Sequence, residues 1–436
     1  MGFFLFKMNK TEQLYKQFIA SPKITTDTRK DVSESIFFAI SGDDFDGNAF
    51  AAKALKKGAN LAVIDNRNFY KGENYFLVDD TLTALQKLAQ LHRANHPIPV
   101  MAITGSNGKT TTKELIASVL ATARNTVSTE GNLNNHIGVP LTILNIKENT
   151  EIAVVEMGAN HPGEIEKLCH IARPDMGIIT NIGKAHLEGF GNFEGVIAAK
   201  NELYTYLINH QGKVVVNADD PLLTGLSRKM NRFTYGRRNA DITGEIIKSS
   251  PSLTVRWKYG QEEHECQTEL FGKYNFYNVL AAIAFGIHQE VPASAINRAI
   301  EEYVPQNNRS QRIKTTKNRI ILDAYNANPV SMREAVSSFR EFASGKPWLI
   351  LGDMFELGNA SREEHLKMIE KIKESGFEQV IFVGPEFYGF RDTNKFIFIH
   401  STEAAAQYLR SHPIENADIL VKGSRGMQLE KLLTFL

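Results

Sequence analysis

Residues 103–112, with the sequence Ile-Thr-Gly-Ser-Asn-Gly-Lys-Thr-Thr-Thr, constrain the fold of this chain more than any other stretch. They follow a short apolar run and precede residues 113–120, whose apolar positions recur with the helical period. A strand, a glycine-bearing loop and a helix place backbone N–H groups and a helix N-terminus where they bind phosphate. In such a loop Lys109 would contact the outer phosphates and the Thr110 hydroxyl would bind magnesium.

The glycine pattern of this loop is shorter than that of a common P-loop. Ile103 stands where glycine would be expected, which leaves Gly-x-x-Gly-Lys-Thr. A plain βα turn is the alternative, because so short a motif also occurs by chance. The preceding strand, the following helix and three successive threonines favour nucleotide binding. The candidate residues are Gly105, Ser106, Asn107, Gly108, Lys109, Thr110 and Thr111.

Composition narrows the class of protein. A length of 436 residues suggests about three domains. A net charge of +1 removes bulk electrostatics as an argument for binding nucleic acid or an anionic membrane. The two cysteines, Cys169 and Cys266, form no CxxC motif, so neither a disulfide framework nor a structural zinc site is expected. We expect a cytoplasmic protein.

The apolar run at the N-terminus is too short for a signal peptide, and Met8 is an alternative start. No run of about 18 apolar residues predicts a membrane span.

Residues 9–97 are predicted to form a small mixed α/β domain. Helices are expected at 11–20, 49–57 and 81–95, and strands at 35–40, 61–64 and 75–78. Two prolines within 96–99 predict a linker, because they cannot continue the last helix.

From residue 100 onward, apolar strands alternate with helices, which predicts a largely parallel sheet with its ligand at the strand C-termini. Strands are expected at 152–155, 176–180 and 213–217, an antiparallel region at 240–270, and further strands at 319–323, 348–353, 379–384 and 418–423. We therefore predict an α/β protein of three domains. These are a small mixed α/β N-terminal domain at 1–97, a central P-loop-type parallel-sheet ATPase domain at 98–308 and a C-terminal Rossmann-like domain at 309–436.

Three side chains near the predicted strand ends are candidates for chemistry. Glu156 follows an apolar strand downstream of the phosphate loop, where a magnesium ligand is expected; a solvated glutamate is the alternative. His186 closes another strand of the same sheet and is either structural or a catalytic or metal-binding residue. Lys200 lies on an apolar helix, and the pattern alone favours a lysine whose ammonium reaches the surface.

Two asparagine-rich segments are candidates for substrate binding. Residues 129–140 are too polar and glycine-broken for a regular element, and their asparagines suit a loop over phosphates or a polar substrate. The alternative is a loop that bonds to its own backbone. Asn326 and Asn328 could hold a peptide-like ligand, or could shape the turn before Pro329. Lys422 and Arg425 follow a strand where they could meet an anionic group.

Taken in chain order, these segments resemble the Mur ligase family, the ATP-dependent amide-forming enzymes of peptidoglycan synthesis. The resemblance covers nearly the whole chain, which makes it far more specific than any single motif. It is carried by 105–111 (Gly-Ser-Asn-Gly-Lys-Thr-Thr), 156–158 (Glu-Met-Gly), 181–186 (Asn-Ile-Gly-Lys-Ala-His) and 199–202 (Ala-Lys-Asn-Glu), and by 45–48 (Phe-Asp-Gly-Asn), 131–135 (Gly-Asn-Leu-Asn-Asn) and 325–329 (Tyr-Asn-Ala-Asn-Pro).

The resemblance implies that the three domains bind UDP-N-acetylmuramoyl tripeptide, ATP and an incoming D-alanyl-D-alanine dipeptide, respectively. It implies ligation through an acyl phosphate, giving ADP and phosphate. We expect a monomer with no nucleic-acid partner. The third residue of the tripeptide, lysine or diaminopimelate, stays open, as does the domain arrangement without ligand.

The resemblance also implies roles for individual residues. Lys109, His186 and Lys200 would be catalytic. Thr110 and Glu156 would hold Mg²⁺, with His186 assisting a second Mg²⁺ site and Lys200 acting as a carbamylated metal ligand. Asn275 would contact adenine, Arg309 phosphate and Asp323 ribose. The UDP-substrate candidates are Thr28, Arg29, Phe45, Asp46, Gly47, Asn48, Asn134 and Asn135, and the dipeptide candidates are Asn326 and Asn328.

Four positions depart from the family pattern and put adenine contact and hinge geometry in question. Tyr274 replaces a usual histidine, Asn308 a usual glycine, and Leu322 the first aspartate of a usual pair; Asn48 stands where histidine is more common.

Three alternative functions remain. A folylpolyglutamate synthetase would not explain 325–329 or the first 90 residues, and a motor or switch NTPase would leave both outer domains unexplained. In a nucleotide-regulated binding module, Lys200 would be merely structural.

Overall fold

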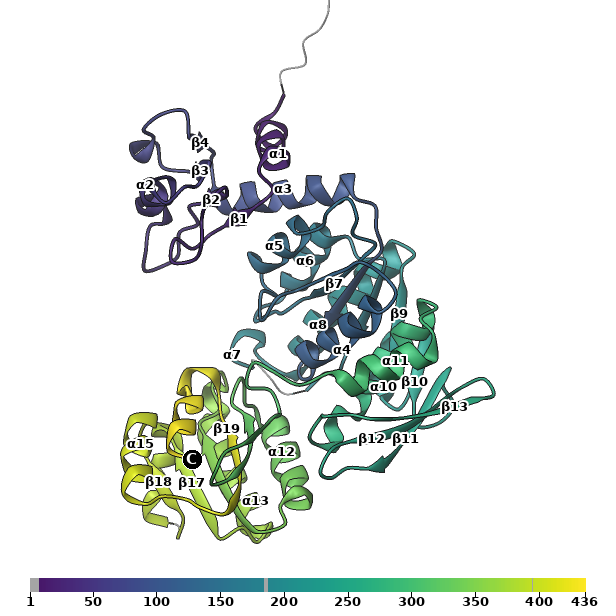
Figure 1. Cartoon of the computed structure of the whole chain (residues 1–436), viewed down its shortest axis with the longest axis vertical. Coiled ribbons are helices and arrows are strands. Elements are labelled where there is room, and N and C mark those ends of the chain that lie inside the picture. The colour runs from purple at the N-terminus through teal and green to yellow at the C-terminus, as the bar shows by residue number, and fades with distance from the viewer. Residues whose placement is uncertain (1–7, 184–186, 394) are drawn as a thin grey trace, which may run out of the picture. The chain divides into compact units, whose positions relative to one another are not determined.

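The structure is a computed structural model that describes residues 8–183, 187–393 and 395–436. Its strands form three sheets, of four, nine and six strands (Figure 1). The chain divides into two compact units. The first runs to Ala102 and adds Arg124–Gly158 and Glu164–Asp175; the second contains Ile103–Ala123, Ala159–Gly163 and Met176–Leu436. The predicted α/β class, with a small first sheet, a large parallel-rich sheet and a C-terminal sheet, is confirmed.

The first sheet belongs to a small α/β layer, as predicted, and all of its strands are parallel. Its core contains Phe37, Ala54 and Ile64. α1 starts after Asn9, whose side chain forms a capping box with Glu12. The elements are α1 (Lys10–Ala20), β1 (Ile24–Thr25), β2 (Ile36–Phe38), η1 (Gly47–Phe50), α2 (Ala51–Lys56), β3 (Leu61–Ile64), η2 (Arg67–Phe69), β4 (Tyr75–Leu77) and α3 (Thr81–Asn95).

The nine-stranded sheet has the order β13-β12-β11-β10-β9-β8-β5-β7-β6. The antiparallel region predicted at 240–270 is confirmed by β11, β12 and β13. β10 was not predicted, because its polar sequence hides a strand that pairs in parallel with β9 and β11. The strands are β5 (Val100–Thr104), β6 (Thr126–Ser128), β7 (Ile152–Glu156), β8 (Met176–Ile179), β9 (Lys213–Asn217), β10 (Asn231–Gly236), β11 (Ile242–Lys248), β12 (Thr254–Tyr259) and β13 (Glu262–Gln267).

The helices of this region include one that the sequence did not suggest. α5 starts at Gly138, although 129–140 seemed too polar for an element. Pro140 lies in its first turn, where no intrahelical N–H is needed, and Ile143 and Leu144 are buried. The helices are α4 (Lys109–Ala121), α5 (Gly138–Leu144), α6 (Glu164–Ala172), α7 (Leu187–Phe190), α8 (Phe193–Asn209), α9 (Pro221–Leu226), η3 (Lys273–Asn275), α10 (Phe276–His288) and α11 (Ala293–Glu302).

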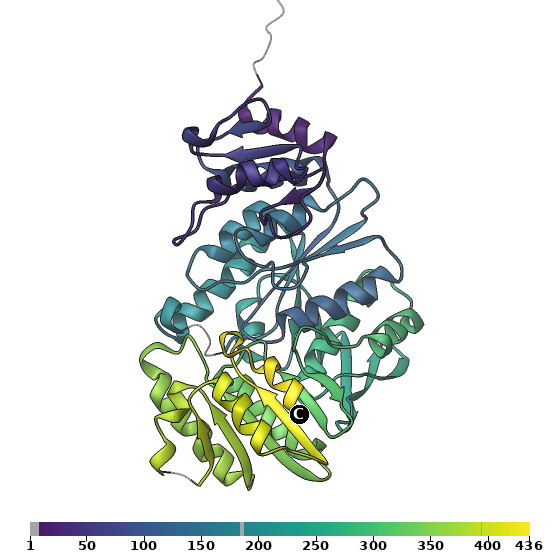
Figure 2. The same cartoon turned by 60° about the vertical axis from the view of Figure 1, so that its left-hand side comes forward.

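The C-terminal sheet, of order β14-β15-β19-β16-β17-β18, has a hydrophobic cluster on each face. The four predicted strands are confirmed, and an antiparallel β14 and a parallel β18 extend the edges. Figures 1 and 2 show helices on both faces. The elements are β14 (Gln311–Lys314), β15 (Arg319–Asp323), α12 (Pro329–Phe342), β16 (Lys346–Gly352), η4 (Gly358–Ala360), α13 (Ser361–Glu374), β17 (Gln379–Val383), α14 (Pro385–Tyr388), η5 (Arg391–Thr393), β18 (Ile397–Ile399), α15 (Thr402–Ser411), β19 (Ala417–Lys422), η6 (Arg425–Met427) and η7 (Leu429–Phe435).

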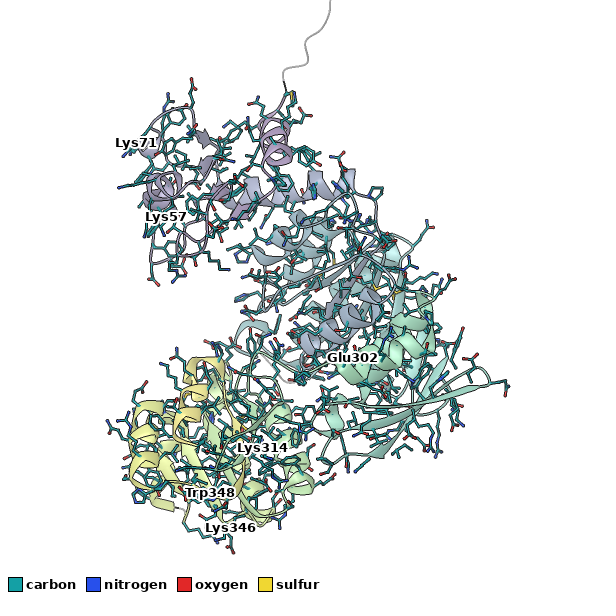
Figure 3. The ribbon with its side chains drawn as sticks, in the orientation of Figure 1. Lys57, Lys71, Glu302, Lys314, Lys346 and Trp348 are labelled. Carbon is teal, nitrogen blue, oxygen red and sulfur yellow. The ribbon has the colours of Figure 1, made fainter. Side chains whose placement is uncertain are left out.

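The two ends of the strands in the C-terminal sheet carry different side chains. Lys314, Lys346 and Trp348 lie towards the end where the parallel strands begin (Figure 3). Asp323 and Lys422 lie at the opposite end, where β15 and β19 finish in register. The carboxyl ends of parallel strands are where α/β sheets bind ligands.

One hydrophobic cluster of the C-terminal sheet includes residues from the segment before α10. Phe271 is buried in it, its ring 5.5 Å from that of Phe342, and Tyr274 packs against its margin. Among the described residues, no helix combines the length and the apolar character needed to cross a membrane.

Candidate active site

The phosphate loop requires glycine at two positions. Gly105 and Gly108 have φ angles of 141° and 78°, which side chains rarely adopt. A Cβ on Gly105 would lie 2.1 Å from Thr180 Oγ1, and one on Gly108 would lie 2.6 Å from Asn278 Oδ1. Glycine is therefore required at both positions for two reasons: the φ angles are unfavourable for other residues, and a Cβ would collide with a neighbouring side chain.

Residues 180–183, at the end of β8, hold this loop in place. The Asn107 N–H donates to Asn181 Oδ1 at 3.0 Å, and Asn181 Nδ2 donates back to the Asn107 carbonyl at the same distance. The same carbonyl accepts from Thr180 Oγ1 at 2.7 Å, and Ser106 Oγ accepts from the Gly183 N–H at 2.9 Å. These contacts preorganise the loop. The predicted His186 lies outside the described residues.

Lys109 and Thr110 begin α4 directly after the loop. Lys109 Nζ donates to the carbonyls of Gly105 and Ser106, at 2.7 and 3.3 Å, so its ammonium lies against the loop. Thr110 is buried in the first helical turn. Both lie in the positions that the motif predicts relative to strand, loop and helix.

A buried amide network links α4 to α10. Asn278 Oδ1 accepts from Thr112 Oγ1 at 3.0 Å, and Asn278 Nδ2 donates to Asn275 Oδ1 at 2.8 Å. Asn275 Nδ2 in turn donates to the Phe271 carbonyl at 2.8 Å. The predicted adenine-contacting Asn275 is thus held rigidly by its own unit.

Lys200 is buried on α8, with 1% of its surface exposed. Its Nζ lies 3.4 Å from the Ala159 carbonyl and 5.3 Å from the centre of the Phe190 ring. The interpretation from pattern alone, an ammonium that reaches solvent, is wrong. The apolar neighbours of Lys200 on α8 indicated that this face of the helix is buried. The prediction nevertheless placed the ammonium at the surface, because charged groups are usually solvated.

Glu156 ends β7 in the first unit and is 1% exposed. Its Oε1 accepts from Asn134 Nδ2 at 2.8 Å, and its N–H donates to Thr129 Oγ1 at 3.0 Å. The solvated-glutamate alternative is therefore wrong. Asn135 behaves differently, because its Oδ1 accepts from the N–H groups of Ile137 and Gly138 at the start of α5.

The predicted UDP-binding segments belong to the first unit. Arg29 binds Asp27 through two hydrogen bonds of 2.9 Å, and this guanidinium lowers the pKa of the Asp27 carboxyl to about 2. Asn48 is buried, with Nδ2 donating to Asp46 and Asp65 at 2.7 and 2.8 Å. Of the remaining predicted residues, Thr28 and Gly47 are buried and Phe45 is 56% exposed.

Asp323 lies at the carboxyl end of β15 and is held from two sides. Lys422 Nζ donates to its Oδ2 at 2.6 Å, and the Ser310 N–H donates to its Oδ1 at 3.1 Å. Lys422 is thus paired inside the protein and does not meet the external anion that the sequence suggested, whereas Arg425 pairs with Glu430 at the surface.

Arg309 lies beside this group. Its guanidinium carbon lies 3.6 Å from the centre of the Tyr325 ring. Its Nε is buried and has no hydrogen-bond partner in the described part of the chain. An arginine N–H so placed suits an anionic ligand.

Asn328 and Asn326 shape the start of α12. Asn328 Oδ1 accepts from the Ser331 N–H at 2.9 Å, which makes Asn328 the N-cap, and Asn326 Oδ1 accepts from the Ala327 N–H. The turn-shaping alternative therefore holds for both oxygens. Asn328 Nδ2 also donates to Asn107 Oδ1 in the phosphate loop at 2.7 Å.

Sequence reasoning missed Thr180, Asn278 and Ser310. Asn278 carried a signal, since it lies three residues after Asn275 on one helix face. Thr180 was read only as the last residue of a strand. Ser310 carried no signal, because its partners lie far away along the chain.

The donor chemistry fits a magnesium–nucleotide complex. Among the described residues no three histidines, cysteines or acids cluster to hold a metal ion. Mg²⁺ needs no such cluster, because it keeps several waters and binds one or two protein oxygens together with phosphate oxygens. The Thr110 hydroxyl and the Glu156 carboxylate are oxygen donors of this kind.

Two family models match the chain. Residues 103–286 match the Mur ligase middle domain, and residues 308–425 match the model described as Mur ligase, glutamate ligase domain. A UDP-N-acetylmuramoyl-tripeptide–D-alanyl-D-alanine ligase from Bacillus subtilis (strain 168) is 35% identical over 422 residues, 94% of this chain and 92% of that protein.

Solved structures agree over the same length. A crystal structure of MurF from Acinetobacter baumannii has a TM-score of 0.85 and 31% identity, and covers 94% of this chain and 92% of its own. A MurF ligase from Thermotoga maritima in complex with ADP has a TM-score of 0.83 and 26% identity, covering 95% and 97%.

Proposed function

This chain belongs to the Mur ligase family, and from that premise we propose that it joins D-alanyl-D-alanine to UDP-N-acetylmuramoyl tripeptide at the expense of ATP. The reaction is one step of peptidoglycan precursor synthesis and gives ADP and phosphate. The observation that carries the proposal is agreement over 94% of the chain with ligases of that name. The preorganised phosphate loop supports the proposal, because such a ligase must bind the phosphates of ATP.

The chemistry follows from the weakness of a carboxylate as an acyl donor. Transfer of the γ-phosphoryl group of ATP to the terminal carboxylate of the tripeptide makes an acyl phosphate. Lys109 and the loop N–H groups bind the phosphates and offset the repulsion between two anions. The dipeptide amine then attacks the acyl carbon, and phosphate leaves the tetrahedral intermediate. Closure around the substrates excludes water, which would otherwise hydrolyse the acyl phosphate.

The metal sites are part of the proposal. Thr110 and Glu156 are the proposed ligands of one Mg²⁺, and His186 assists a second. Bound Mg²⁺ supplies neutralisation of phosphate charge. Lys200 is the proposed carbamate; its burial on α8 supports a role inside the protein rather than at its surface.

The remaining roles are proposed from the resemblance and supported by placement. Asn275 contacts adenine, Asp323 the ribose and Arg309 a phosphate, which suits an Nε that has no hydrogen-bond partner among the described residues. The segments around Arg29, Asn48 and Asn134 bind the UDP-linked substrate, and those around Asn326 and Asn328 bind the dipeptide. We propose a monomer that works in the cytoplasm, where ATP and nucleotide-linked precursors occur.

One assay tests the proposal. The protein is incubated with ATP, Mg²⁺, D-alanyl-D-alanine and UDP-N-acetylmuramoyl tripeptide, in separate reactions with lysine or diaminopimelate as the third residue. We expect ADP and phosphate in equal amounts, released only when both acceptor and donor are present. Formation of AMP and pyrophosphate, or ADP release that ignores the dipeptide, would contradict the ligase assignment.

A further inference from the structure

A series of hydrogen bonds connects the C-terminal sheet to η3, which carries the predicted adenine-contacting Asn275 and is called the nucleotide segment below. It starts at Tyr274 in η3, whose hydroxyl shares a hydrogen bond of 2.6 Å with Ser310 Oγ. The Ser310 N–H continues it to Asp323 Oδ1, and Lys422 Nζ binds Asp323 Oδ2. Lys422 Nζ also donates to the Asn326 carbonyl at 3.1 Å. The series thus ends in the loop that carries the predicted dipeptide-binding asparagines.

The backbone at Ser310 is strained and held by its partners. Asn307, Asn308 and Ser310 have φ angles of 58°, 58° and 49°, in the left-handed region. For Ser310 this conformation costs roughly 1–2 kcal/mol, whereas asparagine adopts it more readily. Ser310 uses both its hydroxyl and its N–H in hydrogen bonds, so Tyr274 and Asp323 together fix this conformation. Arg309, between these residues, is fixed with them.

Lys422 is a buried cation whose position is determined by one carboxylate. Its side chain is 2% exposed, and its register partner across β19 and β15 is Asp323. A buried ammonium that loses its counter-charge is strongly destabilising. The ammonium therefore fixes the Asp323 carboxylate and the Asn326 carbonyl relative to each other.

Tyr274 packs against the C-terminal sheet, although in the sequence it comes before α10 and well before that sheet begins. It packs against the hydrophobic cluster that contains Phe271 and Phe342. Desolvation raises the pKa of its hydroxyl well above the usual value, so the hydroxyl stays neutral. The next residue, Asn275, leads through Asn278 to α4, the helix of the phosphate loop.

We propose that Tyr274 and Lys422 are positioning residues for the Asp323 carboxylate: Lys422 holds Oδ2 directly, and Tyr274 acts on Oδ1 through Ser310. Their hydrogen bonds join the nucleotide segment at Asn275 to the dipeptide loop at Asn326. The inference rests on the proposed function, in which Asp323 contacts the ribose of ATP.

The test compares Tyr274→Phe with a matched control. Tyr303, which follows Glu302 (labelled in Figure 3), also donates a hydrogen bond of 2.6 Å, to Glu114, but lies outside the chain of contacts. For each variant we would measure the Kd of ADP by calorimetry, and kcat and KM for ATP and dipeptide. Tyr274→Phe should raise the Kd of ADP and the KM of ATP by about 2- to 10-fold, the value of one hydrogen bond, with kcat within about 2-fold. Tyr303→Phe should leave all four constants within about 2-fold.

Two further variants test the connection itself. Ser310→Ala should reproduce the effect of Tyr274→Phe, and the double variant should be no worse than either alone, because both remove the same hydrogen bond. Lys422→Gln should raise KM for ATP and for dipeptide together, by about 10-fold or more. If Lys422→Gln does not fold, the Tyr274 and Ser310 variants decide.

The inference fails if Tyr274→Phe matches Tyr303→Phe in every constant, or if the Tyr274 and Ser310 effects add. It also fails if Tyr274→Phe lowers kcat alone. Failure of the proposed function has a different signature. The wild-type protein would then make no amide product, while the ADP affinities would still report on Tyr274.

Discussion

His92 on α3 offers a direct test of how burial controls charge in the first unit. Its side chain is 3% exposed. Nε2 lies 2.8 Å from the Ile146 carbonyl and Nδ1 lies 3.3 Å from the Tyr15 hydroxyl, which describes a neutral ring that donates through Nε2 and accepts at Nδ1. Burial, with a smaller contribution from His96, lowers the pKa of His92 from 6.5 to about 4.

The sign and size of the effect follow from these two values. Between pH 6.5 and about 4 the unfolded chain binds the proton and the folded chain does not, so stability falls as pH falls through this window. Full stability is present above the unfolded value. The loss is about 2 kcal/mol at about pH 5 and reaches roughly 3 kcal/mol near the folded pKa, since each pKa unit is worth about 1.4 kcal/mol.

The measurement is unfolding of wild type and His92→Gln between about pH 7 and 4, by denaturant or heat, with far-UV circular dichroism. Glutamine keeps an amide donor for Ile146 but cannot titrate, so the variant should lose about 2 kcal/mol less than wild type on acidification to about pH 5. His96→Gln is the matched control and should keep most of the acid sensitivity. The reasoning is refuted if the wild-type and His92→Gln curves run parallel, or if NMR shows His92 titrating near 6.5.

Three other predictions concern single side chains. Lys200→Ala should lower ligase activity by about 100-fold or more, with partial recovery in added bicarbonate or short carboxylates, and full activity without either would exclude a carbamate role. Gly384→Ala should cost about 2–4 kcal/mol of stability in thermal unfolding, because φ is 124° and its Cβ would lie 2.3 Å from Asp353 Oδ2; Gly225→Ala, with nothing within 4 Å, is the control and should cost nothing. Asn328→Ala should lower stability by about 1 kcal/mol through loss of the α12 N-cap, whereas Asn328→Ser should keep the cap and most of the stability; equal melting temperatures for both would contradict this assignment.

Local patterns predicted the elements that bury long apolar runs. The helix at 81–95 and the strand at 213–217 have the predicted bounds, because their periodicity and caps are unambiguous. The sequence did not predict β10, because pairing with its neighbours, rather than its own polar sequence, makes it a strand. The sequence did not predict α5, because its first turn contains glycine and proline, which ordinarily mark loops.

The separate segments of the candidate site could also be predicted, but their contacts could not. The glycine loop and the strand end at 180–183 were both recognised, yet the pairing of Asn107 with Asn181 depends on the fold. The position of Lys422 after a strand allowed a contact with an external anion, but in the fold its ammonium pairs with its in-register partner Asp323. Long-range pairing of charges leaves no local signal in a single sequence.

The burial of Phe271 has a consequence for anyone who cuts this chain into pieces. The family models meet between residues 286 and 308, and a fragment begun there would seem to contain the whole C-terminal domain. It would lack Phe271, whose ring packs edge-on against Phe342 inside that domain's core. A hole of that size in a core costs about 3–5 kcal/mol. The C-terminal domain is therefore not a self-contained cassette, and a swap between relatives should carry the segment before α10 with it.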